Sequence, residues 1–448
     1  MMNKKDLIIV IFGSTGDLTY RKLIPAIEKL NNEDLITKNF QLLAIGRRDF
    51  NNEDYYKHVL ESNPNLKLDN ISKYTNYYKM QITDNNDYAG LKKYLDNISH
   101  DKTRIIYYLA VAPHFFIPIA NNISENKLLE KGNLNHSLIF EKPFGSDLES
   151  AKMINRKLWK IVEEKQIYRI DHYLAKEMIQ NIMIVRFANK IFEDVWNNKS
   201  IKSIRIYAKE LVGILGRASF YDNSGALKDM VQSHLLQVLS LVAMDPPKSI
   251  GSNDVKDAKV EVLKALKFDQ EAILLGQYKG YLEEENIPKD SKTETFVFLK
   301  TFVDTKRLKG VPIYLLTGKK LDKKSSKIII EFHETDEQKS WGFNTETNKL
   351  YIEFAPSDSV NIFLNSKIPG LTNEAKSINL SYSNELDGND GYEKLLLDAI
   401  NFHQTLFTRW DEIEYSWKFI DQVKKLNKDV FIYDNYEEVV EEIKKIVK

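Results

Sequence analysis

Cysteine is absent from this chain of 448 residues. Without it, no disulfide, thiolate metal site or cysteine nucleophile can be built. Long apolar runs are absent too, because no uninterrupted apolar stretch approaches the ~20 residues that a bilayer requires. The apolar run at residues 7–12 is shorter than the apolar core of a secretory signal, and no small-residue cleavage site follows it. We therefore expect a cytoplasmic protein with no membrane partner.

Net charge is also lacking, because 64 Lys and Arg residues balance 64 Asp and Glu residues. A balanced chain has no overall electrostatic attraction for nucleic acid, so we expect no nucleic-acid partner. Apolar residues make up 43% and charged residues 29%, which excludes a disordered chain and a fibre. At ~150 residues per domain, the length predicts two or three domains.

The first third of the chain alternates apolar runs of β-branched and aromatic residues with amphipathic stretches. The runs that predict strands are 7–12, 41–45, 104–110, 137–140 and 166–170. Strands that alternate with helices predict a parallel, doubly wound sheet. We therefore expect an α/β Rossmann-type domain with a parallel sheet at residues 1–175.

The pattern changes after about residue 175. Long helical stretches are predicted at 174–189 and 226–244, with a strand between them at 203–208. Strand-like runs then follow one another at 294–300, 313–316, 327–332, 350–354 and 361–364. Strands in succession without helical crossovers favour antiparallel pairing. Residues 176–448 are therefore expected to form a larger α+β domain with a mostly antiparallel sheet.

A glycine turn follows the first predicted strand and leads directly into a helix. It reads Gly13-Ser14-Thr15-Gly16-Asp17-Leu18. Glycines at such a turn let the backbone approach a pyrophosphate, and the helix N-terminus offers N–H donors and the positive end of its dipole. Because the spacing is Gly-x-x-Gly rather than the full Gly-x-Gly-x-x-Gly, the turn alone fits a simple strand-to-helix connection equally well.

The second predicted strand ends at two arginines, Arg47 and Arg48. An NAD-specific fold usually has an acidic residue here that binds the ribose 2′-hydroxyl, whereas a guanidinium binds a 2′-phosphate bidentately. A solvated arginine pair at a strand end is the alternative. Because the glycine turn lies roughly 30 residues upstream in the same βαβ unit, we expect NADP as the cofactor, with NAD as a secondary coenzyme.

Two further polar segments follow predicted strands, at the sheet edge where ligands bind in open α/β folds. The first is Glu141-Lys142-Pro143-Phe144-Gly145, and the second extends from Arg169 to Glu177. In the second segment we expect a helix with His172, Tyr173 and Lys176 on its first turn. Imidazole, phenol and ammonium groups at a helix N-terminus would form a phosphate site. A helix cap with a polar first turn is the alternative.

A histidine occurs within the second long helix. Helical spacing places His234 near Leu227, Val231 and Val238, on an apolar stripe where a satisfied core histidine is common. Removing a hydride from a carbon that carries a hydroxyl requires a base for the hydroxyl proton, and the pKa of histidine suits that task. Such a base needs a carboxylate to fix its tautomer, and Asp171 is a candidate.

Together these segments resemble the glucose-6-phosphate dehydrogenase family. The matching segments are 13–23, 108–110, 141–145, 169–174, 186–189, 225–237, 293–296, 317–319 and 395–400. They run in the family's order, so the similarity covers nearly the whole chain. The resemblance implies oxidation of β-D-glucose 6-phosphate to 6-phospho-D-glucono-1,5-lactone with hydride transfer to NADP, the first step of the oxidative pentose phosphate pathway. It also implies a homodimer or homotetramer and a reaction that requires no metal.

The resemblance assigns roles to individual residues. In the catalytic step it makes His234 the general base, oriented by Asp171. For NADP binding it implies Gly13, Ser14, Thr15, Gly16, Asp17, Leu18 and Arg47, with Tyr108 and Lys142 on the nicotinamide side. For substrate binding it implies Lys142, His172, Tyr173, Lys176 and Lys324 near the phosphate, and Glu210, Asp229 and Lys319 at the sugar hydroxyls.

Three positions depart from the family pattern. Ala175 replaces a glycine, Leu316 stands where an arginine usually precedes Thr-Gly-Lys, and Ala355 stands where many members have glutamine. Two other interpretations stay open. A sugar dehydrogenase of the glucose–fructose oxidoreductase type would act on a different sugar, and an inactive homologue would serve as a cofactor sensor or scaffold.

Overall fold

The computed structural model describes residues 4–216, 218–342, 345–372, 374–384 and 391–447. The chain divides into two compact units. The first comprises Met1–Ala175 and Asp390–Ile413, and the second comprises Lys176–Asn389 and Glu414–Lys448. The segment Asp390–Ile413, which the sequence places in the second domain, therefore packs with the first unit. No helix in the described residues is long and apolar enough to span a bilayer.

The first unit is built on a seven-stranded sheet in the order β15-β6-β5-β4-β1-β2-β3. Its strands are β1 (Leu7–Phe12), β2 (Phe40–Gly46), β3 (Thr75–Lys79), β4 (Arg104–Leu109), β5 (His136–Phe140), β6 (Ile167–Ile170) and β15 (Phe407–Thr408). All neighbours pair in parallel except β15, which is antiparallel to β6. The order β3-β2-β1-β4-β5-β6 is that of a Rossmann fold, whose ligand site lies where the strand order reverses, beside β1.

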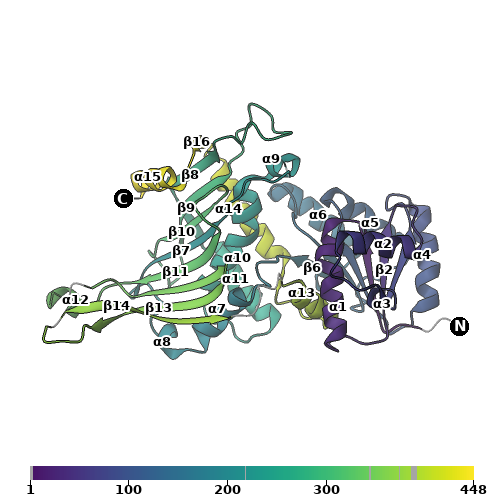
Figure 1. Ribbon diagram of the computed structural model, residues 1–448, viewed down its shortest axis with the longest axis horizontal. Coiled ribbons are helices and arrows are strands. Elements are labelled where there is room, and N and C mark those ends of the chain that lie inside the picture. Colours follow the sequence, from purple (N-terminus) through teal and green to yellow (C-terminus); the bar gives the residue numbers. More distant parts are fainter. Residues whose placement is uncertain (1–3, 217, 343–344, 373, 385–390, 448) are drawn as a thin grey trace. The chain divides into compact units, whose positions relative to one another are not determined.

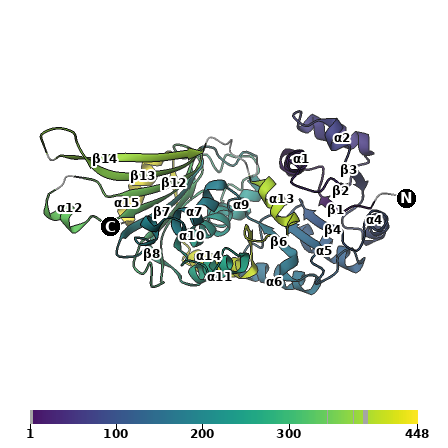
Figure 2. The same ribbon diagram turned by 90° about the horizontal axis from the view of Figure 1, so that it is seen from below.

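Helices cover both faces of this sheet, as Figure 2 shows, with α1, α2 and α13 on one side and α4, α5 and α6 on the other. The helical elements are η1 (Thr19–Leu23), α1 (Ile24–Asn32), α2 (Asn52–Ser62), α3 (Leu68–Ile71), α4 (Asn85–Ile98), η2 (Pro113–Phe115), α5 (Phe116–Glu125), α6 (Leu148–Ile161), η3 (Glu164–Gln166) and α13 (Tyr392–Ile400). Because both faces are covered, every residue of β1, β2 and β4 is buried.

The second unit is built on a nine-stranded sheet in the order β14-β13-β12-β11-β7-β10-β9-β8-β16. Its strands are β7 (Ile201–Lys209), β8 (Leu266–Tyr278), β9 (Phe296–Val303), β10 (Ile313–Gly318), β11 (Ser325–Phe332), β12 (Lys349–Ala355), β13 (Asp358–Lys367), β14 (Ala375–Asn384) and β16 (Val430–Tyr433). Pairing is antiparallel except between β7 and β10 and between β8 and β16. Both sheets confirm the predicted fold class.

Helices lie on both sides of the second sheet. Figure 1 shows α7, α10 and α11 on one side of its strands and α15 on the other. The helical elements are α7 (Glu177–Phe187), α8 (Lys190–Glu193), α9 (Ala218–Ala226), η4 (Leu227–Leu235), α10 (Leu236–Ala243), α11 (Ser252–Lys264), α12 (Asp336–Ser340), α14 (Trp410–Lys424) and α15 (Tyr436–Ile446).

Two helix predictions need correction. The helix expected to open at His172 begins at Glu177, and residues 172–175 form a turn instead. The Asp171 Oδ1 atom accepts the Tyr173 N–H at 2.9 Å, so this side chain competes with helix formation. The helix that carries His234 is a π-helix over Leu227–Leu235, which continues as an α-helix from Leu236.

Candidate active site

The glycine turn connects β1 to the first helix of unit 1. Gly13 has φ +85°, and a Cβ there would lie 2.3 Å from the Ala110 carbonyl oxygen, so only glycine fits. The Ser14 N–H donates to Ile45 O at 3.0 Å, and the Thr19 hydroxyl donates to Gly13 O at 3.3 Å. The turn therefore lies against the end of β2 and against Ala110, which follows β4. Gly16 and Asp17 are exposed.

Arg47 and Arg48 follow β2 and are both exposed. The Arg48 guanidinium lies 5.7 Å from the centre of the Phe50 ring. The Tyr77 hydroxyl donates to Arg48 O at 2.8 Å, which fixes the backbone after the strand. Thr15 lies near Gly46, so the glycine turn and the start of this arginine pair are close.

A buried carboxyl group lies at the C-terminal end of β5. Glu141 Oε1 accepts hydrogen bonds from Tyr108 Oη at 2.5 Å and from Tyr392 Oη at 3.3 Å. Burial raises the pKa of Glu141, and the nearby Asp171 carboxylate raises it further, although both phenols and Lys142 oppose this. Glu141, Lys142 and Asp171 therefore lie within electrostatic range at one edge of the sheet.

Tyr108 is only 1% exposed, and its phenol contacts Glu141. Its predicted place on the nicotinamide side stays a prediction, and the structure adds that its hydroxyl donates to Glu141. Sequence analysis missed Tyr392, which belongs to a segment 251 residues from Glu141. No local signal could have linked the two.

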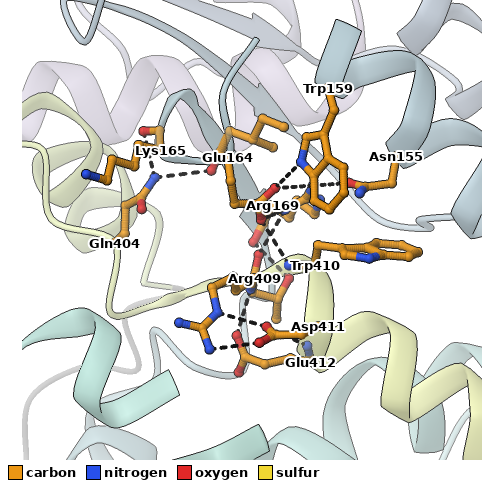
Figure 3. Close-up of polar contacts among 12 residues, drawn as sticks. Asn155, Trp159, Glu164, Lys165, Arg169, Gln404, Arg409, Trp410, Asp411 and Glu412 are labelled. Carbon is orange, nitrogen blue, oxygen red and sulfur yellow. Dashed lines mark hydrogen bonds and ion pairs between the residues drawn. The ribbon is translucent and has the colours of Figure 1, made fainter. Parts of the chain in front are cut away.

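Asp171, His172 and Tyr173 follow β6 in a turn. Asp171 is 3% exposed, and the His172 and Tyr173 rings meet edge to face at 5.3 Å. The end of β6 is held by a polar network around Arg169, which Figure 3 shows. Arg169 is 2% exposed, and its guanidinium binds both carboxylate oxygens of Glu164, at 2.5 and 3.1 Å.

The same network fixes the start of α14. Glu164 also accepts the Trp159 indole N–H at 2.9 Å and the Trp410 backbone N–H at 2.9 Å (Figure 3). Asn155 Oδ1 accepts the second Arg169 donor at 2.6 Å. Burial acts to raise the pKa of Glu164, but the Arg169 charge and these hydrogen bonds hold it below its ordinary value. The strand before Asp171 is therefore rigidly anchored.

Two lysines of unit 2 interact electrostatically. Lys176 caps the N-terminus of α7, and its Nζ donates to Phe354 O at 3.4 Å. Burial lowers the pKa of Lys176, which Asp358 partly offsets and the Lys324 ammonium reinforces. Two like charges kept close together form a site for an anion such as a phosphate group.

Three other predicted residues gather around one phenol in unit 2. Lys319 is 2% exposed, and its Nζ binds Glu210 Oε2 at 2.7 Å and lies 5.1 Å from the centre of the Tyr221 ring. Burial raises the pKa of Tyr221, and the Asp229 and Glu210 carboxylates raise it further. The predicted sugar-binding residues Glu210, Asp229 and Lys319 are thus grouped together, and Tyr221 is the member that sequence analysis missed.

His234 is fully buried in the π-helix. The α-helical spacing expected around it is therefore wrong, because π-helical hydrogen bonds join residues five apart. Asp229 and His234 are five residues apart, so they lie on successive turns of the π-helix. Such segments occur frequently at functional sites.

Comparison with known proteins identifies the family of this chain. Residues 10–181 match the family "Glucose-6-phosphate dehydrogenase, NAD binding domain", and residues 183–448 match "Glucose-6-phosphate dehydrogenase, C-terminal domain". The glucose-6-phosphate 1-dehydrogenase of Bacillus subtilis (strain 168) is 37% identical over 446 residues, covering 93% of this chain and 91% of the relative. The Borreliella burgdorferi enzyme of that name is 38% identical over 453 residues, with 95% and 92% covered.

Solved structures give the same result. A glucose-6-phosphate dehydrogenase in complex with its substrate glucose-6-phosphate superposes with a TM-score of 0.89 at 30% identity, covering 97% of this chain and 95% of that one. Glucose-6-phosphate 1-dehydrogenase from Mycobacterium avium gives a TM-score of 0.85 at 32% identity, with 96% and 94% covered. The chain belongs to the glucose-6-phosphate dehydrogenase family.

Proposed function

We propose that this chain is a glucose-6-phosphate 1-dehydrogenase, which oxidises β-D-glucose 6-phosphate to 6-phospho-D-glucono-1,5-lactone in the oxidative pentose phosphate pathway. The observation that carries the proposal is the 37% identity, over 93% of this chain, to a relative that has this name. Lys176 and Lys324, whose charges interact, are the cationic groups that would bind the substrate's phosphate. An unphosphorylated sugar has no anionic group that these two lysines could bind. We further infer a cytoplasmic homodimer or homotetramer.

The coenzyme in this proposal is NADP. Its diphosphate would be held at the turn from Gly13 to Leu18, where Gly13 lets the backbone turn closely against Ala110 and Gly16 is exposed. Arg47, which is exposed after β2, would bind the 2′-phosphate. When bound, NADP supplies the acceptor for the hydride that leaves C1 of the sugar. Lys142 would lie beside the nicotinamide.

The residues of the chain handle the sugar and the proton. His172, Tyr173, Lys176 and Lys324 would bind the phosphate group, while Glu210, Asp229 and Lys319 would bind sugar hydroxyls. His234 would accept the proton of the 1-hydroxyl as general base. Asp171 would orient the imidazole of His234 and stabilise its protonated form, as a carboxylate does in other base–carboxylate pairs.

The first test is the rate of reduced nicotinamide formation from glucose 6-phosphate, measured in parallel with NADP and NAD. We expect turnover with both coenzymes and a higher kcat/KM for NADP, because the 2′-phosphate can pair with Arg47. Free glucose is the control and should react far more slowly. Equal rates on free glucose would contradict the phosphate assignment, and no turnover with either coenzyme would contradict the proposed activity.

The second test removes the base. His234→Asn should lower kcat by about 10²–10⁴-fold with little change in KM, because the asparagine amide keeps a polar group near the position of Nδ1 but cannot accept the proton. The matched control is His403→Asn, since His403 is largely exposed and lies in the other unit. A near-normal kcat for the His234 variant would remove this residue from the mechanism.

A further inference from the structure

A cavity in unit 2 is lined by residues to which the proposed reaction assigns no role. It has a volume of about 570 Å³, which is in the range of small-molecule sites. Its walls come from β8 and β16, neighbours at one edge of the nine-stranded sheet (Figure 1), together with the end of α14 and the start of η4.

Apolar and cationic side chains both line this cavity. The apolar ones from the two strands and α14 include Leu275, Val423, Val430 and Ile432. The cationic ones are Lys228, Lys292, Lys424 and Lys428, and the acidic ones are Glu294 and Asp429. Apolar side chains together with an excess of lysines over acidic residues fit an anion that carries an apolar body.

Glu294 connects the cavity to the helix that carries Asp229 and His234. Its Oε1 atom accepts the Leu227 N–H at 2.9 Å, and its backbone oxygen accepts the Ala226 N–H at 2.9 Å. A Cβ at Gly225 would lie 2.4 Å from the Glu294 carboxylate, so the two segments are in direct contact. Glu294 thus fixes the point at which the π-helix begins.

Lys228 is the second connection. Its Nζ donates to Asn223 O at 2.6 Å, and it directly precedes Asp229 in the chain. Burial raises the pKa of Glu294, and the Lys228 and Lys424 charges oppose this, so both lysines lie within electrostatic range of its carboxyl group. An anion in the cavity would attract Lys228 and move the backbone next to Asp229.

We propose that this cavity binds an organic phosphate, a small molecule with an aromatic or apolar body and phosphate groups, and that its occupation raises the KM for the sugar phosphate. The phosphates contact the lysines, and the body packs on the apolar wall. The binding site stands on the cavity alone. The effect on KM rests on the proposed function, because it depends on the role of Asp229 in binding sugar.

ATP without magnesium is the probe, and isothermal titration calorimetry measures its binding to the full chain. We expect ATP to bind more tightly than pyrophosphate, which lacks the apolar body, and more tightly than adenosine, which lacks the charge. No binding of ATP would overturn the proposal. Equal affinities for ATP and pyrophosphate would also overturn it, because the apolar wall would then contribute nothing.

Two variants locate the site. Lys424→Gln together with Lys428→Gln should weaken ATP binding at least about tenfold, since two charge-assisted contacts are lost. The control, Lys444→Gln with Lys445→Gln, removes two exposed lysines of α15 and should bind ATP normally. Equal affinity in both double variants would overturn the proposal, because ATP would then be bound elsewhere, for example at the glycine turn.

Glu294→Gln should increase the affinity for ATP, whereas the lysine substitutions should decrease it. It keeps an acceptor for the Leu227 N–H but removes a negative charge that faces the lysines, so ATP should bind several-fold more tightly. A misfolded variant could not give this gain. Unchanged or weaker binding would contradict the position that we assign to the phosphates.

Kinetics test the effect on the sugar site. At one fixed NADP concentration, ATP should raise the KM for glucose 6-phosphate in the unmodified chain and in the α15 control, but not in the Lys424 and Lys428 double variant. An ATP effect that persists in that variant would overturn the coupling. A chain that binds ATP as expected but has no dehydrogenase activity would refute the proposed function and leave the site intact.

Discussion

Lys176 combines burial with a neighbouring like charge, and both lower its pKa. A lysine in this state is costly to keep charged, and a bound phosphate dianion would remove much of that cost. The exposed Lys324 reinforces the lowering of the Lys176 pKa. In the proposed phosphate site Lys324 would add a second cation, so that two ammonium groups would take the place of a bidentate guanidinium.

The pH dependence of kcat/KM for glucose 6-phosphate tests this pair. As pH rises through the lowered pKa of Lys176, the ammonium loses its proton and the affinity for phosphate falls. Lys324→Gln removes one cause of the lowered pKa, so the alkaline decline should move to higher pH although kcat/KM is smaller throughout. Lys324→Arg keeps the charge and should leave the decline in place. Identical alkaline limbs in the Gln variant and the unmodified chain would show that the two charges do not interact.

At the scale of elements, the strands near the site were predictable because their apolar composition is locally encoded. The run at 7–12 is β1 as predicted, and 203–208 lies within β7. The strand β3 (Thr75–Lys79) was missed, since only its first residue is buried and its sequence mixes polar and aromatic residues. The sequence predicts a helix at residues 172–175, where the structure has a turn. The turn depends on the hydrogen bond from Tyr173 N–H to the Asp171 side chain, and the sequence pattern does not reveal that geometry.

The residues of the site were more predictable than their arrangement. The ion pair between Lys319 and Glu210 joins two residues 109 positions apart, so spacing alone could not place them together. The π-helix that carries His234 was unpredictable for another reason. Its apolar pattern fits an α-helix. The hydrogen bonds between residues five apart depend on packing around the first turn, where the Glu294 carboxyl group accepts the Leu227 N–H.

The anchoring of β6 by Glu164 gives the prediction at this scale. Glu164→Gln leaves the buried Arg169 without its counter-charge, and breaking such a pair costs about 3 kcal/mol. The melting temperature at pH 7 should fall by roughly 6–12 °C, as measured by circular dichroism. As a control, Glu442→Gln removes a partly exposed pair with Lys445 and should shift the melting temperature by no more than about 2 °C.

Melting temperatures of the unmodified chain and of Glu164→Gln at low pH test whether the charge of Glu164 stabilises the fold. The pKa of Glu164 is lower in the fold than its ordinary value of 4.5, so the carboxylate stabilises the fold above that pH. This stability is lost as pH falls through the lowered pKa. The difference in melting temperature between the unmodified chain and Glu164→Gln should therefore shrink on acidification below about pH 4.5. A constant difference would mean that shape, and not charge, explains the loss.

At the scale of the whole molecule, the chain leaves unit 1 after Ala175 and returns to it for residues 390–413. The returning segment completes the core of the Rossmann fold: Leu395, Leu396 and Phe407 are each only 1% exposed. Phe407 packs edge to face on Tyr168, with ring centres 4.8 Å apart. The apolar residues of 390–413 do not themselves indicate which unit they pack in. The sequence therefore predicts a single domain boundary, after residue 175.

The returning segment also satisfies polar groups of unit 1. The buried guanidinium of Arg104 donates to Ala399 O at 2.7 Å and lies 4.2 Å from the centre of the Phe402 ring. Burying the three large side chains Leu395, Leu396 and Phe407 contributes about 5–9 kcal/mol. That contribution is comparable with the whole stability of a typical domain, which is about 5–15 kcal/mol. Residues 1–175 alone should therefore lack a stable fold.

A direct fusion tests this conclusion, because the two parts of unit 1 meet where the fusion would join them. A Cβ at Gly391 would lie 2.5 Å from the Ala175 Cβ, so a short glycine linker can connect residue 175 to residue 391. The fused chain, 1–175 joined to 391–413, should melt cooperatively, give a dispersed amide NMR spectrum and bind NADPH. The fragment 1–175 without the segment should do none of these. If that shorter fragment folded and bound NADPH as well as the fusion, the returning segment would be an appendage of the Rossmann fold and not a part of its core.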